Sequence, residues 1–388
     1  MRLNWLVTFA WSEVGAQPHS DEIEITTFGP GFGESTIIHI GDGKWIIVDS
    51  CIDTTDATDR RSVAEKYLRA MGVDLACQVE LIVATHWHDD HVRGLGQLLY
   101  SCKSARFSCA SSLLNKEFIT YIEEMATGAT ATAGAKVSEF RSVLRVMREG
   151  SRKPIKYSSA GRELLTWRAE ELSHRESCVV RVFSPSDEEY SIFLRDLASL
   201  HPKHGEAKRA AVARIPNLSS VVMHLQFDSF AILLGADMET HSCNLRGCAA
   251  AVDEAIERRA DRSVIFKVAH HGSINGDYPG IWKNLLLDTP VCIVTPFNKL
   301  PRSKKLPTDA DVTRLSQRSG KLFLTSQPGN AMPIHARDSV TQRSLRESGI
   351  KLQNIAKNLG AVRLRRKVGA CAMTWNTELL GAAFEILK

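Results

Sequence analysis

The stretch VELIVATHWHDDH, residues 79–91, decides the fold. Its first half, Val79 to Ala84, is a nearly continuous apolar run, which predicts a strand buried on both faces of a sheet. Its second half carries four potential metal ligands directly after that strand: His86, His88, Asp90 and His91. Since ligand-binding side chains gather at the carboxyl ends of strands in open α/β sheets, the stretch predicts an α/β fold with a site at this strand end.

The spacing of these four side chains predicts a site for two metal ions. His86 and His88 are two residues apart and can converge on one metal, whereas Asp90 and His91 can face a second one. Imidazole nitrogens and carboxylate oxygens are ordinary zinc ligands, so we expect two Zn²⁺ ions, with Mn²⁺ as an alternative. Such a pair can hold a bridging hydroxide as the nucleophile of a hydrolytic reaction.

Two further strand ends carry residues of the ligand type. Asp237 follows the apolar run 230–234, and His270-His271 follows the apolar run 264–269. Three strand ends that all present such residues predict that the site is completed by residues distant in sequence.

These motifs resemble those of the metallo-β-lactamase superfamily. His86–His91 matches its H-x-H-x-D-H signature, and the chain also carries Gly235-Ala236-Asp237 and His270-His271-Gly272-Ser273. Together with Gly29–Gly33, Asp49 and Asn217-Leu218-Ser219-Ser220, they look most like the hydrolase domain of DNA-uptake competence proteins of the ComEC/Rec2 type and its free-standing relatives. The resemblance implies an αββα sandwich with the site along its open edge.

The resemblance also implies a role for each site residue. His86 and His88 would bind the first metal, Asp90 and His91 the second, and Asp237 would bridge the two. His271 is favoured over His270 as the last ligand of the second metal, because the family places this ligand just before a glycine. Asp90 and His270 are the catalytic candidates, His270 as a substrate-facing or proton-donating group. Asp49 would orient the motif loop, as partners of metal ligands usually do.

One departure concerns the first metal. Most of the superfamily has a third histidine for it, shortly before the strand that leads to the bridging aspartate. Here that region reads Pro216-Asn217-Leu218-Ser219-Ser220, and Asn217 is a weak ligand. His201 and His204 are alternatives for this place, whereas His224 lies within a predicted strand and is expected in the core.

Outside the motifs, the chain is predicted as one domain with additions. Residues 22–28 and 35–40 are expected to form a hairpin around Gly29–Gly33, because a β-branched strand and not a helix follows the glycines. Residues 1–330 form the predicted hydrolase domain, with a helical, basic insert at about 100–175. Residues 331–388 are a C-terminal extension expected to pack on the same domain.

Composition agrees with a globular protein of ordinary type. The 388 residues are 44% hydrophobic and 24% charged, and the net charge of +5 permits an anionic substrate without demonstrating one. The nine cysteines show no C-x-x-C pair and are predicted to be reduced thiols. Since the N-terminus does not look like a secretory signal and no apolar run is long enough to span a bilayer, we expect a cytoplasmic protein without a membrane partner.

The leading functional prediction is hydrolysis of a phosphodiester, in nucleic acid or a nucleotide, by a phosphodiesterase or nuclease. Two metals suit in-line displacement at phosphorus, and the basic insert favours the same substrates. A second hypothesis is hydrolysis of a small ester, lactone or lactam. A third is a non-catalytic accessory subunit of a bacterial defence or DNA-processing complex, with the insert or the C-terminal extension as the surface for a protein partner.

Overall fold

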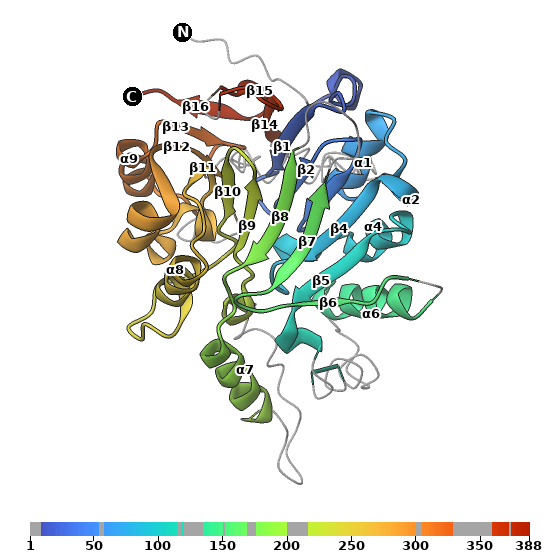
Figure 1. Cartoon of the computed structure of the whole chain (residues 1–388). Helices are drawn as coiled ribbons and strands as arrows, with labels where there is room; N and C mark the ends of the chain where they lie inside the picture. The colour runs from blue at the N-terminus through green and yellow to red at the C-terminus, as the bar shows by residue number, and fades with distance from the viewer. Residues whose placement is uncertain are drawn as a thin grey trace, which may run out of the picture.

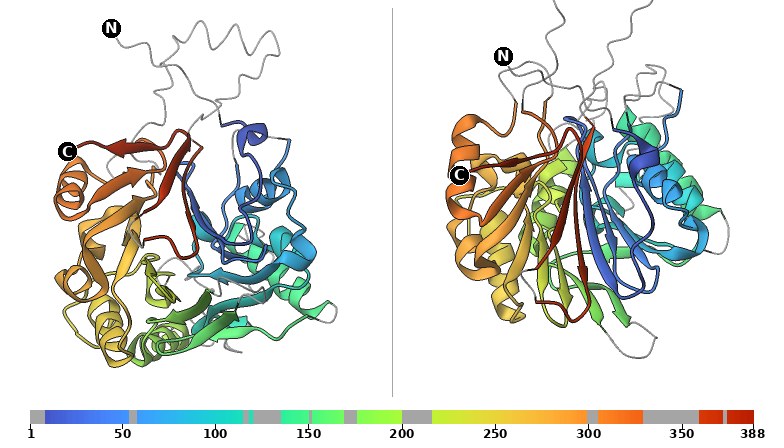
Figure 2. Two further views of the ribbon diagram at one scale, coloured as in Figure 1. Left: turned by 45° about the horizontal axis from the view of Figure 1, so that its top comes forward. Right: turned by 90° about the horizontal axis from the view of Figure 1, so that it is seen from above.

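The computed structural model describes residues 9–53, 58–114, 118–119, 135–149, 152–168, 176–199, 216–298, 305–328, 359–371 and 374–388. Over these residues the chain forms two eight-stranded sheets. The sheets pack face to face and carry helices on their outer faces (Figures 1 and 2). This is the four-layered αββα arrangement that the resemblance implied.

The first sheet holds the strand that precedes the histidine motif. Its order is β15-β14-β1-β2-β3-β4-β5-β6, and β3 to β6 run parallel to one another. The strands are β1 Glu22–Phe28, β2 Ser35–His39, β3 Trp45–Val48, β4 Val79–Ala84, β5 Arg106–Ala110, β6 Lys156–Ser158, β14 Gly360–Lys367 and β15 Asn376–Gly381.

The second sheet supplies the other two strand ends of the predicted site. Its order is β16-β13-β12-β11-β10-β9-β8-β7, and β10 to β13 are parallel. The strands are β7 Glu163–Arg168, β8 Ser177–Val182, β9 Met223–Phe227, β10 Ala231–Leu234, β11 Ser263–Lys267, β12 Leu286–Val294, β13 Lys321–Leu324 and β16 Phe384–Ile386.

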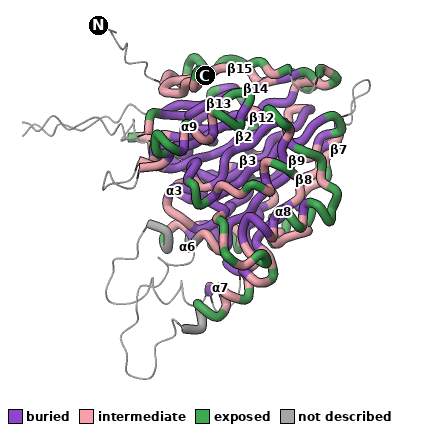
Figure 3. Tube along the Cα trace, turned by 90° about the vertical axis from the view of Figure 1, so that its left-hand side faces the viewer, coloured by how far each residue is buried: buried purple, intermediate pink, exposed green. Residues whose placement is uncertain are grey.

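Helices cover the outer face of each sheet. On the first sheet lie α1 Val63–Ala70, α2 Leu75–Gln78, α4 Leu95–Ser101 and α6 Ala135–Arg148; on the second lie α8 Gly247–Glu257 and α9 Asp309–Arg318 (Figure 2). The short α3 Asp89–Val92 lies within the histidine motif, and α7 is Asp187–Ser199. Strands are buried, and exposure is concentrated on helices and edges (Figure 3). Among the described residues, no helix is long and apolar enough to cross a membrane.

The predicted hairpin around Gly29–Gly33 is confirmed, since β1 and β2 pair antiparallel. Gly33 has a φ of +106°, and a Cβ at this position would lie 2.6 Å from the Cβ of Cys51 and 3.1 Å from the carbonyl oxygen of Asp90. Glycine is therefore needed here because the backbone is left-handed and another chain segment passes close by. The hairpin is packed directly on the loop that carries the metal ligands, and the Glu34 N–H donates to the Asp90 carbonyl at 2.9 Å.

The stretch 100–175 differs in part from the helical insert that we predicted. It contains α6, but it also contributes β5 and β6 to the first sheet and β7 to the second. Residues 115–117, 120–134, 150–151 and 169–175 of this predicted insert lie outside the described residues. In the C-terminal stretch, β14 pairs with β1 and β16 pairs with β13, so this part of the chain adds strands to both sheets.

Candidate metal centre

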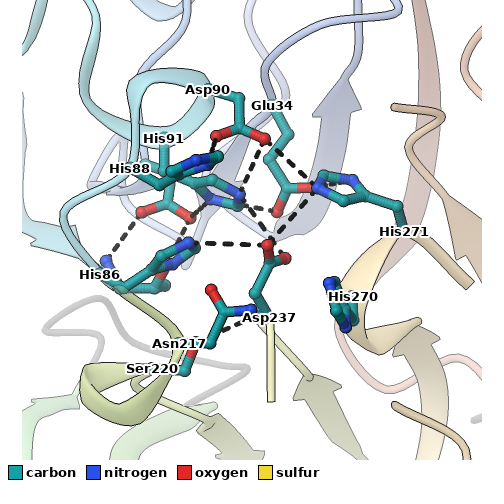
Figure 4. Close-up of polar contacts among 12 residues, drawn as sticks. Glu34, His86, His88, Asp90, His91, Asn217, Ser220, Asp237, His270 and His271 are labelled. Atoms are coloured by element: carbon teal, nitrogen blue, oxygen red, sulfur yellow. Dashed lines mark hydrogen bonds and ion pairs between the residues drawn. The ribbon is translucent and has the colours of Figure 1, made fainter. Parts of the chain in front are cut away.

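The predicted ligands meet where three strands end, one in the first sheet and two in the second. His86, His88, Asp90 and His91 follow β4, Asp237 follows β10, and His271 follows β11. Figure 4 shows their side chains pointing toward one another from both sheets. The two sheets thus bring together residues that are up to 185 positions apart, from His86 to His271.

Four of these residues form a compact, buried cluster. Asp90, His91, Asp237 and His271 each offer one ligand atom, and these atoms all lie within 4.8 Å of one another. His271 Nε2 lies 3.3 Å from Asp90 Oδ2 and 3.5 Å from Asp237 Oδ2. His91 Nε2 lies 3.8 Å from Asp90 Oδ2 and 3.6 Å from Asp237 Oδ1. The cluster consists of the four residues that were predicted to hold the second metal.

The ligands predicted for the first metal are less completely assembled. His86 Nε2 faces Asp237 Oδ2 at 3.6 Å, so Asp237 lies within reach of ligands on both sides, as a bridging carboxylate should. His88 instead turns its Nδ1 to Asp90 Oδ1, and its side chain is about a quarter exposed. The rings of His86 and His88 are 6.1 Å apart.

The donor atoms fit metal ions because, among the described residues, they lie against one another without forming hydrogen bonds. His86 Nε2, His91 Nε2 and His271 Nε2 are buried without a hydrogen bond, as are both carboxylate oxygens of Asp90 and Oδ1 of Asp237. Buried polar atoms are normally paired, so such a cluster of nitrogens and oxygens without hydrogen bonds suits a bound cation.

The opposite nitrogen of each of these histidines is held by the protein. His91 Nδ1 lies 2.7 Å from Asp49 Oδ2, His271 Nδ1 lies 2.9 Å from the Thr295 carbonyl oxygen, and His86 Nδ1 lies 3.1 Å from Thr85 Oγ1. Metal-binding histidines commonly use their second nitrogen in this way, which fixes the ring and its tautomer. The pattern leaves Nε2 of all three rings for the metals.

Asp49, for which the resemblance implied an orienting role, contacts both ends of the motif loop. Besides His91, its carboxylate accepts the backbone N–H of Thr85 at 2.7 Å and the Thr85 hydroxyl at 2.8 Å. Asp49 thereby ties the end of β3 to the start of the motif loop. Burial raises the pKa of Asp49, although the pairing with His91 acts in the opposite direction.

Left-handed backbone conformations are concentrated at this site. Asp49, Ala236, His270 and His271 all have positive φ, between 46° and 61°. Such conformations cost non-glycine residues energy and often mark functional sites. Here they turn the chain sharply after β3, β10 and β11, which directs the following side chains toward the cluster.

The site electrostatics couple acids to histidines. Burial alone would raise the pKa values of Asp90 and Asp237, but the neighbouring His91 and His271 outweigh it and hold both values well below the ordinary range. Burial would lower the pKa of His271, yet the carboxylates around it raise the value to about 10. Burial lowers the pKa of His86 well below normal, which keeps its imidazole neutral. The carboxylates are therefore ionised and able to bind cations.

Sequence reasoning missed a buried ion pair behind the cluster. Glu34 Oε1 lies 2.5 Å from Lys267 Nζ, and both side chains are at least 95% buried. Glu34 also accepts the Thr295 hydroxyl and lies within 3.7 Å of the Nδ1 atoms of His91 and His271. The available signal was a single lysine near the end of the apolar run 264–269, because a charge buried in a strand needs a partner.

Asn217 and His270 share a different partner. The Asn217 amide donates to Glu239 Oε1 at 2.9 Å, and His270 Nδ1 lies 3.4 Å from the same oxygen. Asn217 is thus engaged by Glu239, and His270 lies beside the cluster without belonging to it (Figure 4). The alternatives His201 and His204 lie outside the described residues. His224 is buried, with Nε2 2.9 Å from the Asp261 carbonyl, as expected of a core residue.

Comparison with known proteins supports the resemblance to the metallo-β-lactamase superfamily. Residues 28–113 match the model described as the metallo-beta-lactamase superfamily, a range that includes Glu34, Asp49 and the motif 86–91. No curated protein matches the chain.

Solved structures with the same family name align at low similarity. The metallo-beta-lactamase fold protein YhfI from Bacillus subtilis is 10% identical with a TM-score of 0.39, and the match covers 80% of this chain and 98% of that one. A HARLDQ-motif mutant of a metallo-beta-lactamase from Cronobacter sakazakii is 16% identical with a TM-score of 0.30, covering 64% and 77%. Likenesses this distant say nothing about substrate.

Proposed function

We propose that this chain, which carries the metallo-β-lactamase signature within residues 28–113, is a hydrolase with two metal ions that cleaves phosphodiesters in nucleic acid or nucleotides. One observation supports it most: Asp237 lies within 3.6 Å of His86 on one side and of His91 and His271 on the other. A carboxylate in reach of both ligand groups is what two adjacent metal positions require. Zn²⁺ is the proposed metal, with Mn²⁺ as the alternative.

The residues divide into metal-holding and substrate-facing groups. His86, His88 and Asp237 would hold the first ion, and Asp90, His91, His271 and Asp237 the second. Two divalent ions, when bound, supply an activated water and the positive charge that in-line displacement at phosphorus needs. Asp49 keeps His91 aligned, and His270, whose Nδ1 lies 3.4 Å from Glu239 Oε1, lies beside the cluster and would face the substrate.

Phosphorus is favoured over carbonyl carbon by an arginine that follows the histidine motif. Arg93, two residues after His91, has a buried Nε without a hydrogen bond and makes no ion pair with any described residue. An arginine without a carboxylate partner suits an anionic ligand such as a phosphate.

The test is a substrate screen with the full chain loaded with Zn²⁺ or Mn²⁺. Single- and double-stranded DNA, RNA, cyclic dinucleotides and bis(4-nitrophenyl) phosphate represent the proposed class, and nitrocefin and 4-nitrophenyl acetate represent the carbonyl alternative. We expect phosphodiester cleavage that falls at least 100-fold in His86→Ala and Asp237→Asn. Turnover of the carbonyl substrates alone would replace the proposal.

Metal analysis separates the enzyme from a non-catalytic accessory subunit. Purified protein is expected to contain zinc or manganese or to bind either on addition, and Asp237→Asn should bind less than wild type. A chain that binds neither metal and cleaves none of the substrates would favour the accessory role.

A further inference from the structure

We propose that Phe32, Phe297 and Arg93 form a subsite for an unpaired nucleobase and its phosphate beside the metal centre. The inference rests on the proposed phosphodiesterase function and narrows its substrate to nucleotides whose base is free to stack. Single-stranded nucleic acid and small nucleotide diesters share this chemistry, whereas a base paired within a duplex does not.

The two phenylalanine rings lie directly beside proposed metal ligands. The Phe297 ring centre is 5.2 Å from that of His271 and 6.5 Å from that of His88, and it is tilted only 25° from the His88 plane. Phe32 lies 5.5 Å from Phe297 on a different loop. The pair is therefore within one nucleotide of the place where the scissile group would bind.

The rings are not explained by core packing. Both are half-buried, and neither belongs to the two hydrophobic cores formed by the described residues. Partly exposed aromatic rings beside a polar site are what base stacking uses, since every base offers a flat face that an aromatic side chain can cover.

Arg93 adds a cation to this aromatic pair. Its guanidinium carbon lies 5.0 Å from the Phe32 ring centre, and its Nε is buried without a hydrogen bond. With no ion pair to any described residue, the guanidinium retains donors for a phosphate. A flat cation over an aromatic ring also favours a stacked base.

Backbone hydrogen bonds hold the subsite in place. The Asn298 N–H donates to the Gly31 carbonyl at 2.6 Å, which joins the loops of Phe297 and Phe32. The Glu34 N–H donates to the Asp90 carbonyl at 2.9 Å, which joins the Phe32 loop to the metal ligands. The rings are therefore positioned relative to the metal centre before a substrate binds.

The kinetic test compares two substrates with one leaving group, thymidine 5′-(4-nitrophenyl phosphate) and methyl 4-nitrophenyl phosphate. Stacking on one aromatic side chain contributes roughly 1–3 kcal/mol, so Phe297→Leu and Phe32→Leu should raise KM for the thymidine ester at least about fivefold more than for the methyl ester. Tyr157→Leu is the control, because Tyr157 is an aromatic residue exposed on edge strand β6 and is expected to change neither KM.

A binding test does not depend on turnover. The zinc-loaded full chain is titrated with fluorescent, hydrolysis-resistant phosphorothioate strands: decathymidylate, an abasic strand of equal length and a duplex. We expect decathymidylate to bind most tightly, Phe297→Leu to weaken it at least about fivefold, and Arg93→Gln to weaken both single strands and reduce the salt dependence.

The outcomes separate this inference from the proposed function. Discrimination between decathymidylate and the abasic strand that is lost in Phe297→Leu, without diester cleavage, would keep the subsite and reject the phosphodiesterase. Diester cleavage with equal KM effects on both esters and equal binding of both strands would reject the subsite and keep the phosphodiesterase. A third result would be that the variants raise KM more for the thymidine ester than for the methyl ester, while decathymidylate and the abasic strand bind equally. The base would then belong to a small nucleotide and not to a nucleic acid strand.

Discussion

His91 Nδ1 lies 2.7 Å from Asp49 Oδ2, so a residue at the end of β3 fixes the ring of a proposed metal ligand 42 positions later. The same carboxylate holds the backbone N–H and hydroxyl of Thr85, whose hydroxyl lies 3.1 Å from His86 Nδ1. Asp49 thus positions a ligand of each metal at once, and its effect on metal binding can be measured directly.

Replacing Asp49 by asparagine is expected to weaken zinc binding about 10- to 100-fold, because the His91 ring loses its carboxylate partner. Competition with a fluorescent chelator measures the dissociation constant. Asp74→Asn is the matched control, since Asp74 caps the exposed helix α2 and is expected to leave zinc binding unchanged. An unchanged constant in Asp49→Asn would show that His91 does not need this partner.

The unequal assembly of the two metal positions predicts two classes of metal affinity. The cluster of Asp90, His91, Asp237 and His271 is already in place, whereas His88 must leave Asp90 to join His86. We expect calorimetric titration to show that each chain binds one Zn²⁺ ion tightly and a second Zn²⁺ ion more weakly.

Variants of single ligands show which residues bind the tightly held Zn²⁺ and which bind the weaker one. His88→Ala should remove only the weaker equivalent, and His271→Ala should weaken the tight one at least about tenfold. Equal loss of both equivalents in His88→Ala would contradict the proposed division of the ligands.

Much of this architecture could be predicted from local patterns. The apolar run 79–84 is β4 as predicted, and the glycine-rich hairpin and the strand before Asp237 were recognised for the same reason: hydrophobic pattern and turn residues act over a few neighbours. The strands within 100–175 were missed. β6 has three residues, and β7 is largely exposed, so neither has the long apolar run that marks a buried strand.

The site was predictable only where its ligands are contiguous or follow a strand. The hydrogen bond between Thr295 and Glu34 joins residues 261 positions apart, and the pairing of Glu34 with Lys267 spans a similar distance. The apolar run around Lys267 indicates that its charge needs a partner, but no local pattern identifies Glu34 as that partner, because both contacts depend on how the two sheets face each other. The same reason hid the approach of Phe297 to Phe32.

Removing one partner of the buried Glu34–Lys267 ion pair is expected to destabilise the fold. Lys267→Met leaves the Glu34 carboxylate buried without its partner and should lower the free energy of unfolding by about 3–5 kcal/mol. Urea denaturation with the metals chelated measures this loss. The double variant Glu34→Gln/Lys267→Met should recover part of it, since no unpaired charge remains.

A surface ion pair provides the comparison for these variants of the Glu34–Lys267 pair. Lys44 and Glu80 lie 2.7 Å apart but are partly exposed, so Lys44→Met should cost at most about 1 kcal/mol. If Lys267→Met were no more harmful than Lys44→Met, the buried pair would not contribute as proposed.

His39 predicts a loss of stability in mild acid. Burial lowers its pKa to about 4, although the hydrogen bond of Nδ1 with the Glu22 carbonyl oxygen, at 2.8 Å, acts in the opposite direction. In the folded chain Nε2 accepts the Gly43 N–H at 3.0 Å, which suits the neutral ring. The His39 imidazole is protonated near pH 6.5 in the unfolded chain but only near pH 4 in the folded chain. The free energy of unfolding therefore falls as the pH falls between these values. The contribution is about 2 kcal/mol between pH 7.5 and 5. Urea denaturation should show a smaller pH dependence in His39→Gln than in wild type, whereas His19→Gln at an exposed position should behave like wild type; equal pH dependence in all three would refute the assignment.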